Sequence, residues 1–589
     1  MKHIMQAQLE KYLLSLFWEK YGITIQSLDF STPPNKKMWD IAFWCFIFAK
    51  EMKKSPIEIS QNISETIQSD QNKPEFIQSV QSEWPYINFF LSEDIYTQAF
   101  SDMMLRENIY ENISWSTSET IYIDYIWANV WKPLHIGHMC TPNQGQVLIN
   151  LFQKLWYNVI SDSHIWDWGI IFGKLIVAYE TYGSEMELEN NAVEHLFQLY
   201  VKISKDAEQD ENLDQKFRDA FKKLSLWDTQ YVQKWEKFTK YSILAMNQQL
   251  GRLWVHPMYN IWESFYEGLW LPKMEDYPDL KFSMKDIVSE LIEKNIATRN
   301  EDGSVWVVFP EEMKIPSCIL QKRDGTHGYL ASDLASVKYR MENWNPQKIL
   351  YFVDVRQQLH LRQCFTISQM AGWLSDDTEL THAYNWFIAL KDGAMSTRKG
   401  KIIKLESLLD EWIQRAKNII LEKRNDISWD ELDTLAEKIS IGAIKYGYLK
   451  KSRMTDIIFD WDEFMSFEWN SGPYIQYAYV RAKKILEKYN STLSFENLKY
   501  SLTEEKQLLK AILQFEEVIS EVSKNYLPHI LCQYVYDTTK VFSVFYNNVS
   551  VFSEEDEVLI ASRIALVAWF IRIIEESFSI LSIPLPDKM

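Results

Sequence analysis

The chain has 589 residues, of which 47% are hydrophobic and 24% are charged, and its formal net charge is −19. This length exceeds what one hydrophobic core supports, so several domains are expected. The acidic balance argues against an indiscriminate polyanion binder, although a local basic surface on an acidic protein still permits RNA as a partner.

Cysteine usage and the distribution of apolar residues indicate the compartment. The five cysteines are scattered without a CxxC pair, which disfavours a zinc ribbon or a disulfide framework and favours a reducing environment. Charges are spread through the N-terminus, no cleavage signal follows, and no apolar run reaches membrane-spanning length. We therefore expect a cytoplasmic protein with no membrane partner.

Tryptophan is unusually frequent and glycine unusually rare. The 24 tryptophans and 17 glycines together make up about 7% of the chain, the share that glycine alone normally has. We hypothesise that many of these tryptophans are glycines in the protein made by its source, through a stop codon, UGA, that is read there as glycine. The alternative is a chain that is truly rich in tryptophan.

Residues 1 to about 115 alternate amphipathic helices with strand-like pieces. The run Trp84–Leu91 predicts a strand whose alternation places Tyr86 and Asn88 on one face. An aromatic ring beside an amide suits stacking on, and hydrogen bonding to, an unpaired base, whereas ordinary sheet packing is the competing interpretation.

The stretch Ile121–Ile126 predicts a strand, because β-branched and aromatic residues crowd it. After a loop, His135-Ile136-Gly137-His138 lies where the strand gives way to a helix, the point at which a parallel α/β sheet presents backbone N–H groups to phosphates. Two incidental polar histidines at a helix start are the alternative. A helix to Gln153 and a strand Tyr157–Ser163 are expected next.

Residues 185 to about 315 look inserted and contain charged helices over Asn190–Gln249. Strand–helix alternation is expected to resume at Ser317–Gln321, Arg323–Arg340 and Ile349–Trp373, and to end in the loop Lys391–Gly400. From about residue 405 nearly everything predicts helix. The expected fold is therefore multidomain α/β: a Rossmann-like parallel-sheet catalytic domain with insertions, an N-terminal α+β domain and a C-terminal all-α bundle.

The HIGH turn after a strand, followed far downstream by a Met-Ser loop rich in Lys and Arg, resembles a class I aminoacyl-tRNA synthetase. In detail the chain resembles arginyl-tRNA synthetase over essentially its whole length. The matching motifs are Asp124, Asn129, Lys132 and Pro133 before HIGH, then Asp167-Trp168-Gly169, Asp324-Gly325-Thr326, Tyr329, Asp333-Leu334-Ala335, Gln357–His360, Met395–Gly400, Ser471–Arg481 and Pro584–Met589.

This resemblance implies four segments and a two-step activity. Residues 1–115 are expected to bind the tRNA D-loop, 116–404 to form the catalytic domain interrupted at about 185–315, 405–465 to form a connecting helical stem, and 466–589 to form the helical anticodon-binding domain. The implied enzyme is an arginine–tRNA ligase. It activates L-arginine with ATP to arginyl-adenylate and transfers the arginyl group to the 3′-terminal adenosine of tRNA(Arg), releasing AMP and pyrophosphate. ATP with Mg²⁺, no zinc and a monomeric state are expected.

The first step needs little covalent catalysis, because the substrate carboxylate is itself the nucleophile. The site must orient that carboxylate and stabilise charge on the phosphoryl oxygens. The resemblance assigns catalysis to His135, His138 and Lys132, and ATP binding to Gly137, His360, Met395, Ser396, Arg398 and Lys399. Lys132 is expected to compensate for a departure from the family's usual lysine loop, because Ala394 and Thr397 stand where two lysines are common.

Arginine recognition requires carboxylates, since a guanidinium is planar, always charged and suited to paired hydrogen bonds. In the matching motifs Asp124 and Asp333 supply them, and Tyr329 lies four residues before Asp333 on one helix face. Asn129 and Gln357 match positions that hold the α-amino or carboxylate end. An isolated Asp is more often a cap or a surface residue, which is the competing interpretation for both.

The expected tRNA contacts are Tyr86 and Asn88 in the N-terminal domain and Tyr474, Tyr477, Arg481 and Met589 near the anticodon. A buried core stripe is the alternative for the two later tyrosines. Family members commonly need bound tRNA before they activate arginine, which the resemblance implies here too. A synthetase for glutamate or cysteine, or a non-catalytic tRNA-binding paralogue, remains as a rival function.

The same resemblance bears on the tryptophans. Trp168 matches a tryptophan of the family. Ten others stand where the family usually carries glycine or another small residue: Trp84, Trp127, Trp131, Trp156, Trp166, Trp254, Trp262, Trp270, Trp386 and Trp469.

Overall fold

The computed structural model describes residues 2–31, 40–113, 118–268, 276–386, 388–390, 403–424, 426–464, 470–489 and 497–589. Its contacts divide the chain into two compact units, which are described separately. The first comprises Met1–Ile113, Ala482–Ser520 and Asp537–Ile573, and the second Ser114–Arg481, Glu521–Tyr536 and Ile574–Met589. None of the helices in the described ranges combines the length and the apolar character that crossing a bilayer requires.

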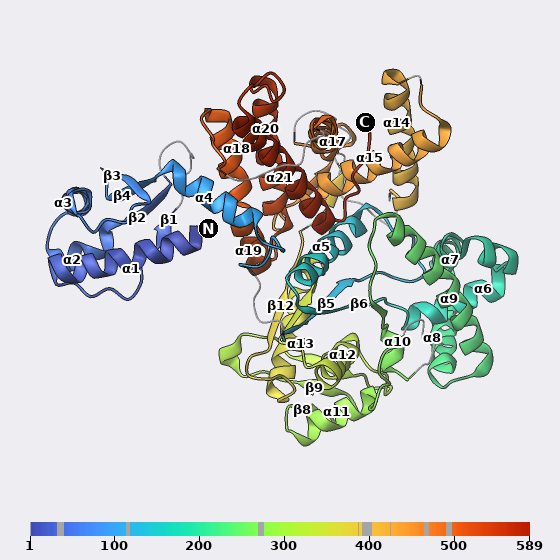
Figure 1. Cartoon of the computed structure of the whole chain (residues 1–589). Helices are drawn as coiled ribbons and strands as arrows, with labels where there is room; N and C mark the ends of the chain where they lie inside the picture. The colour runs from blue at the N-terminus through green and yellow to red at the C-terminus, as the bar shows by residue number, and fades with distance from the viewer. Residues whose placement is uncertain are drawn as a thin grey trace. The chain divides into compact units, whose positions relative to one another are not determined.

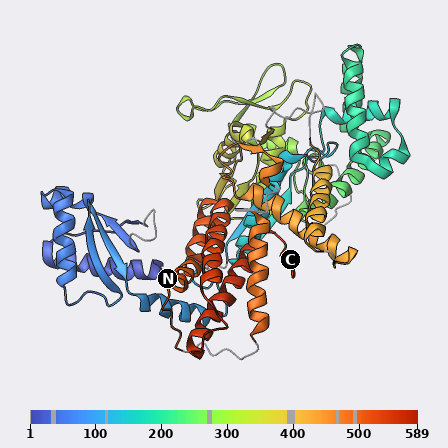
Figure 2. The same ribbon diagram turned by 90° about the horizontal axis from the view of Figure 1, so that it is seen from above.

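The N-terminal part of the first unit is an antiparallel sheet in the order β1-β2-β4-β3, with α3 packed on β3. Figures 1 and 2 both show this α+β arrangement in blue. Its elements are α1 (Lys2–Tyr21), β1 (Phe30–Ser31), β2 (Ile41–Trp44), α2 (Ala49–Met52), α3 (Pro56–Ser69), β3 (Ile77–Glu83), β4 (Tyr86–Leu91) and α4 (Glu93–Met104). Buried aromatic rings form its core, where Phe43 stacks on Phe89 and meets Phe17 edge-on.

The strand expected at Trp84 begins two residues later, at Tyr86, because Trp84 and Pro85 form the two-residue turn of a β3–β4 hairpin. The φ of Trp84 is 55°, in the left-handed region. Proline fixes its own φ near −65°, so the turn has a positive φ at its first central residue alone, the pattern of a II′ turn that places glycine there.

The centre of the second unit is a five-stranded sheet in the order β12-β11-β5-β6-β7, and every pairing in it is parallel. Its strands are β5 (Thr120–Ile126), β6 (Asn158–Ser163), β7 (Tyr259–Asn260), β11 (Lys348–Tyr351) and β12 (Glu379–His382). Every residue of β5 is buried, as expected for a central strand of a parallel sheet. The chain runs outward from β5 in one direction through β6 and later in the other through β11, so the strand order reverses between β5 and β11.

Helices cover this sheet and extend it. They are α5 (Cys140–Lys154), α6 (Ile170–Tyr182), α7 (Glu185–Ala207), α8 (Asn212–Ser225), α9 (Thr229–Arg252), α10 (Glu263–Tyr266), α11 (Met284–Glu293), α12 (Tyr329–Trp344) and α13 (Gln358–Met370). Helices α6 to α9 contact one another and form a distinct helical group, visible in both views (Figures 1 and 2). This group includes the charged helices expected in the insertion.

The strand expected at Ser317–Gln321 forms, but it lies outside the parallel sheet. The strand there, β10 (Cys318–Gln321), pairs antiparallel with β9 (Val305–Val307), which pairs in turn with β8 (Ala297–Arg299) in a separate small sheet. The following helix begins at Tyr329 rather than near Arg323, because the Asp324 carboxylate accepts a hydrogen bond from the Thr326 backbone N–H and closes a turn.

The C-terminal segment is almost entirely helical, as expected. Its elements are α14 (Leu405–Lys423), α15 (Trp429–Leu449), α16 (Trp461–Phe464), α17 (Gly472–Lys488), α18 (Thr503–Leu513), α19 (Phe515–Asn525), α20 (Pro528–Asn548) and α21 (Glu557–Leu581), with two short paired strands, β13 (Ile388–Leu390) and β14 (Ile457–Phe459). In the first unit Phe542 of α20 stacks on Phe570 of α21 with ring centroids 3.9 Å apart.

Three tryptophans occupy an unusual backbone position. Trp156, Trp227 and Trp254 each follow the last residue of a helix, α5, α8 or α9, and have φ values of 61°, 65° and 54°. In each case the next residue donates its N–H to a carbonyl five residues back, with Tyr157 to Phe152, Asp228 to Lys223 and Val255 to Leu250 at 3.0, 3.1 and 3.1 Å. This is the Schellman motif, whose left-handed residue is usually glycine.

Candidate active site

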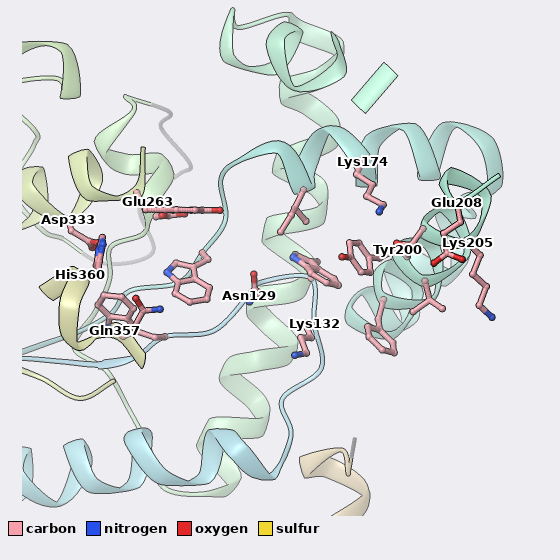
Figure 3. A pocket seen from close by; sticks show the side chains of 18 residues that line it. Asn129, Lys132, Lys174, Tyr200, Lys205, Glu208, Glu263, Asp333, Gln357 and His360 are labelled. Carbon is pink, nitrogen blue, oxygen red and sulfur yellow. The ribbon is translucent and has the colours of Figure 1, made fainter. Parts of the chain in front are cut away.

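The candidate site lies where the strand order reverses, at the carboxyl ends of β5 and β11, the place where open α/β sheets bind ligands. A pocket of about 990 Å³ opens there. Figure 3 shows Asp333, His360, Glu263 and Gln357 gathered at one end of it, with Asn129 and Lys132 towards the middle. The far end is lined by residues of α6 and α7, with Lys174, Tyr200, Lys205 and Glu208 labelled in Figure 3.

Asn129 and Gln357 enter the pocket from loops that follow neighbouring strands. The loop after β5 is held by backbone pairing with the loop after β6, because Trp166 donates its N–H to Ala128 at 2.9 Å. Gln357 ends a short 3-10 helix, Val355–Gln357, that leads from β11 into α13. The tertiary fold thus brings together Asn129, Lys132, Tyr329, Asp333, Gln357 and His360 of the sequence-predicted residues.

The HIGH segment forms a 3-10 turn, Ile136–Met139, that leads into α5, with His135 as its N-cap. The Nδ1 atom of His135 accepts a hydrogen bond from the Gly137 N–H, and Nδ1 of His138 accepts one from the His135 N–H, both at 3.1 Å. A ring nitrogen that accepts from a backbone N–H carries no proton, so the neutral tautomer of each ring has its proton on Nε2.

Burial lowers the pKa of His135 to about 4, with nearby Lys132 adding to the effect, and burial also holds the pKa of His138 well below its usual range. Both imidazoles are therefore neutral Nε2–H donors at neutral pH. The ring centroids lie 4.1 Å apart. Neither histidine ring lines the pocket. Lys132, whose charge helps to lower the pKa of both rings, does line it.

Lys132 is half-buried, and burial together with the charge of Arg356 lowers the pKa of its ammonium group. Arg356 itself is held by Asp354 in a paired interaction, with Nε to Oδ1 at 2.7 Å and Nη2 to Oδ2 at 2.8 Å. Two cations from different elements thus face this part of the site.

The HIGH turn is paired with the residues that follow the second signature loop. The Ile136 N–H donates to the Ile403 carbonyl at 3.2 Å, and the Leu405 N–H donates to the Leu134 carbonyl at 2.9 Å. The predicted ATP-binding residues of that loop, Met395, Ser396, Arg398 and Lys399, lie outside the described residues.

Asp333 is almost fully buried in α12, and both of its carboxylate oxygens are engaged by histidines. Nε2 of His164 lies 3.3 Å from Oδ1, and Nε2 of His360 is hydrogen-bonded to Oδ2. Burial opposes ionisation of Asp333, but the two imidazoles outweigh it and hold the pKa of this carboxyl well below its usual range. Asp333 is therefore an ionised carboxylate at the wall of the pocket.

Asp124 is placed differently from Asp333. It is fully buried, it does not line the pocket, and its Oδ2 accepts a hydrogen bond from Arg340 Nη2 at 2.8 Å. The parallel register sets Asp124 beside Asp162 of β6, and Arg340 bridges both carboxylates. Burial, with Asp124 adding to it, raises the pKa of Asp162 to about 6, against the opposing charge of Arg340.

An indole separates Asp124 from the pocket. Trp127 lines the pocket, and its Nε1 donates a hydrogen bond to Oδ1 of Asp124 at 2.5 Å. Its ring also packs against His164, with ring centroids 4.9 Å apart. Trp131, which also lines the pocket, packs against Tyr200 at 4.2 Å between ring centroids.

Sequence reasoning missed Glu263, which lines the pocket from α10 and is only 3% exposed. Its Oε2 atom has no hydrogen-bond partner in the part of the chain that the structure describes, and burial holds its pKa well above the usual range. Asp167 positions this helix, because its Oδ1 and Oδ2 accept hydrogen bonds from the N–H and hydroxyl of Ser264 at 3.0 and 2.5 Å. Glu263 lies in a segment whose apolar residues follow neither a helical nor a strand pattern. The sequence therefore held no clear signal that would have singled it out.

His164 and Arg340 were missed as well. His164 stands in the loop after β6, three residues before the Asp167 motif, and Arg340 lies on α12 two turns after Asp333. Its position directly after a predicted strand could have identified His164 as a candidate site residue, because ligands bind at the carboxyl ends of parallel strands. The role of Arg340 depends on two carboxylates from distant strands, which no local pattern indicates.

The tRNA-contact candidates of the N-terminal domain share β4 but differ in exposure. Tyr86 is half-buried and stacks on Trp44, with ring centroids 5.6 Å apart. Asn88, on the same strand between β2 and β3, is only 2% exposed. Tyr86 is therefore the accessible member of the pair.

The later candidates lie on α17 and at the C-terminal end. Tyr477 is exposed, and the Arg481 guanidinium lies 4.3 Å from its ring centroid and donates a hydrogen bond to its hydroxyl at 2.8 Å. Tyr474 is half-buried and meets Tyr536. Met589 packs against the apolar cluster of α14 and α15. The core-stripe alternative therefore fails for Tyr477, whose face of α17 points away from the buried one.

Among the described residues, no group of three or more His, Cys, Asp or Glu side chains is arranged to hold a metal ion. All five cysteines are buried and unpaired.

Three family models match successive parts of the chain. The family described as tRNA synthetases class I (R), catalytic domain, matches residues 100–461; the DALR anticodon binding domain matches 475–589; and the arginyl tRNA synthetase N terminal domain matches 2–91. The chain is 33% identical to an arginine–tRNA ligase of Clostridium botulinum over 95% of each chain. It is 34% identical to one of Fusobacterium nucleatum over 86% of this chain and 85% of that one.

Two solved structures share the fold across nearly the whole chain. The arginyl-tRNA synthetase of Plasmodium falciparum superposes with a TM-score of 0.80 at 22% identity, covering 99% of both chains. That of Thermus thermophilus superposes with a TM-score of 0.78 at 21% identity, covering 99% of this chain and 100% of the other.

Proposed function

The chain belongs to the family of class I arginyl-tRNA synthetases, and from that membership we propose that its pocket activates L-arginine with ATP and charges tRNA(Arg). The ionised Asp333 at the pocket wall carries this proposal, because arginine is the one amino acid whose side chain is a permanent, planar cation. A pocket for glutamate or cysteine has no use for a buried carboxylate there.

In the first step the guanidinium binds Asp333, with Tyr329 beside it at the start of α12. Asn129 and Gln357 hold the α-amino and carboxylate end, so that the carboxylate faces the α-phosphate of ATP. Their entry from loops after β5 and β11 supports this division, and Asn129 lies towards the middle of the pocket, away from Asp333 (Figure 3). With glycine at position 127, no indole would occupy Oδ1 of Asp124, and Asp124 would become a second guanidinium ligand.

The HIGH turn and its neighbours bind the phosphates. His135 and His138 donate from Nε2 to the oxygens on which charge develops, with Gly137 between them allowing close approach. Lys132 supplies the cation that the altered second loop lacks, together with Arg398 or Lys399. His360, Met395 and Ser396 complete the ATP contacts.

Mg²⁺ enters with the triphosphate, since this ion is usually held by one or two carboxylates together with substrate phosphates. In the second step a ribose hydroxyl of the 3′-terminal adenosine takes the arginyl group and AMP leaves. The exposed pair Tyr477 and Arg481 suits stacking on an unpaired anticodon base, and Tyr86 suits the D-loop. Asn88, Tyr474 and Met589 are weaker candidates because all three are packed against the protein. A cytoplasmic location and a monomeric state stay predictions of the sequence.

An arginine-dependent charging assay tests this function. We expect the enzyme to esterify tRNA(Arg) with arginine and not with lysine, glutamate or cysteine, and Asp333→Asn to lower kcat/KM for arginine at least a hundredfold, because the buried fork loses its charge. Charging with another amino acid, or with none, would overturn the proposal.

We further propose that many of the tryptophans are glycines in the protein made by its source, through a recoded stop codon. The left-handed backbone at Trp84, Trp156, Trp227 and Trp254 supports this, because L-residues with a bulky side chain rarely adopt it. The same Schellman position is filled by Gly372 after α13 and by Asn295 after α11, the two residue types that tolerate it best.

The pocket gives separate support for Trp127 and Trp131, where indoles occupy space beside the substrate ligands. The φ angles of Trp127, Trp131, Trp166, Trp262 and Trp386 are not positive. For these five positions the proposal of glycine therefore depends on the family resemblance. Trp270 and Trp469 lie outside the described residues. Peptide mass spectrometry of the protein purified from its source decides each position. Tryptophan at all four left-handed sites would refute the recoding.

A further inference from the structure

We propose that binding of arginine expels one proton from the histidine pair on Asp333, and that His360 is the group that gives it up. This rests on the proposed function, because it takes Asp333 as the guanidinium ligand. The observation behind it is that both oxygens of this carboxylate are already occupied, one by His164 and one by His360.

The two histidines differ in their access to the pocket. His360 lines the pocket from α13 and its side chain is 24% exposed, whereas the His164 side chain is 1% exposed and does not line it. A guanidinium that enters the pocket therefore meets Oδ2 of Asp333 on the side of His360. His164 remains behind the carboxylate on Oδ1 and acts as a positioning residue.

The charges around the pair come from several elements. Glu263 of α10, Asp167 of the loop after β6, Asp124 of β5, Arg340 of α12 and Tyr351 of β11 all interact with members of the cluster, and Cys364 of α13 lies near Asp333. Burial keeps Glu263 a neutral acid, and Asp124 is neutralised by Arg340. Burial also raises the pKa of Asp167 to about 7, and among the described residues Asp333 is the carboxylate that both imidazoles contact.

Protonation of both rings is consistent with this geometry. Burial lowers the pKa of each ring, but the Asp333 carboxylate more than compensates, raising the pKa of His164 to about 9 and that of His360 above its ordinary value. At pH values below the raised pKa of His360, the empty site holds two imidazolium cations on one carboxylate.

A guanidinium cannot lose its own proton, so its entry adds a third cation to a single negative charge. It takes the Oδ2 position, the hydrogen bond from His360 breaks, and His360 is left beside two cations in a buried site. The neutral imidazole is favoured there. The balanced step is that arginine and the protonated enzyme give the complex with neutral His360, and one proton passes to solvent.

The consequence is a pH-dependent affinity for arginine. Wherever His360 is protonated in the empty site and neutral in the complex, the Kd for arginine falls up to tenfold for each unit of rising pH. The KM for arginine should follow the same slope, because the guanidinium is the group that displaces His360.

Isothermal titration of L-arginine in buffers with different ionisation enthalpies measures the protons released. We expect close to one proton per arginine at pH 5.5, where a His360 ring with a raised pKa is protonated in the empty site, and close to none for His360→Gln, which keeps a hydrogen-bond donor but cannot titrate. His256→Gln, at an exposed histidine outside the pocket, is the matched control and should release the same proton as the parent protein.

Binding without proton release, or release that His360→Gln leaves unchanged, overturns the inference. A second measurement covers the case in which His360→Gln does not fold: the pH profile of KM for arginine in the parent enzyme, where a KM that does not fall as the pH rises from 5.5 to 7 would also overturn it. Unimpaired arginine binding by Asp333→Asn would instead remove the proposed guanidinium ligand itself, so the two failures are distinguishable.

Discussion

Trp127 donates its indole N–H to Oδ1 of Asp124 at 2.5 Å, so the side chain of one predicted glycine position occupies an oxygen of one predicted arginine ligand. Arg340 already holds the other oxygen of that carboxylate. With tryptophan at position 127, both oxygens of Asp124 are therefore occupied by protein groups, and Asp333 is the ionised carboxylate at this end of the pocket.

Removing this indole should improve arginine binding. For Trp127→Gly we expect KM for arginine to fall at least tenfold in the charging reaction, because Asp124 Oδ1 becomes free to accept from the guanidinium and the pocket gains space. Trp429→Gly, at an exposed tryptophan at the start of α15, is the control for a mere loss of indole. An unchanged KM in Trp127→Gly would mean that Asp124 has a structural role only.

The Schellman tryptophans should gain stability when they are replaced by glycine. Trp156→Gly, Trp227→Gly and Trp254→Gly should each raise the free energy of unfolding by about 1 kcal/mol, because the left-handed conformation costs an L-residue about that much. Thermal unfolding followed by circular dichroism measures this.

Two controls isolate the backbone effect. Trp156→Ala keeps a Cβ and should show no comparable gain. Trp235→Gly should lower the midpoint temperature of unfolding by a large amount, since the Trp235 side chain is fully buried and its indole N–H donates to the Asp167 carbonyl at 2.8 Å. A loss of stability in all three Schellman variants would remove the backbone argument for glycine.

The HIGH histidines should act as neutral donors. We expect His138→Ala to slow arginyl-adenylate formation about 10²- to 10³-fold, measured as ATP–pyrophosphate exchange with tRNA(Arg) present, because one pre-positioned donor to the phosphoryl oxygens is lost. His256→Ala should leave the rate unchanged.

The pH dependence of the same reaction has a definite sign. Protonation of His135 at Nδ1 would oppose its bond from the Gly137 N–H, and its pKa is lowered to about 4, so this ring should not contribute a fall in rate between pH 8 and pH 5.5. A fall that His135→Gln abolishes, with a midpoint near 6.5, would contradict the neutral-donor assignment.

Lys132 should matter for the nucleotide. Lys132→Ala is expected to slow ATP–pyrophosphate exchange at least tenfold, since the second signature loop lacks the two usual lysines. Lys205→Ala removes an equal charge from the far end of the pocket and should change the rate less than twofold. Equal losses in both variants would indicate a general effect of charge on ATP binding rather than a contact by Lys132.

Glu263 should make stability fall as pH rises. Its folded-state pKa is raised by burial, so the folded protein binds more protons than the unfolded chain at pH values above the ordinary pKa of glutamate, and stability declines from there until the folded-state pKa is passed. Glu263→Gln should flatten this decline in thermal midpoints measured from pH 5 to pH 8. An unchanged slope would assign the decline to other groups.

Interactions between residues that are close along the chain made several features of this protein predictable from its sequence. The β-branched run of β5, the Gly between two histidines and the helical spacing of Tyr474, Tyr477 and Arg481 each depend on neighbours along the chain, and the structure forms the corresponding strand, turn and helix face. The rarity of glycine suggested that some tryptophans replace glycines, and the family resemblance singled out Trp84, Trp156 and Trp254 among them, although not Trp227.

Only the tertiary structure decided which of these groups are free to act. Asp124 and Asp333 look alike in sequence, yet Arg340, 216 residues from Asp124, neutralises the first, while His164 and His360 flank the second. Glu263 enters the pocket through a helix whose position depends on Asp167, 97 residues before Ser264. The reason is physical: burial and pairing set the charge state of a carboxylate, and both come from segments that only the folded sheet brings together.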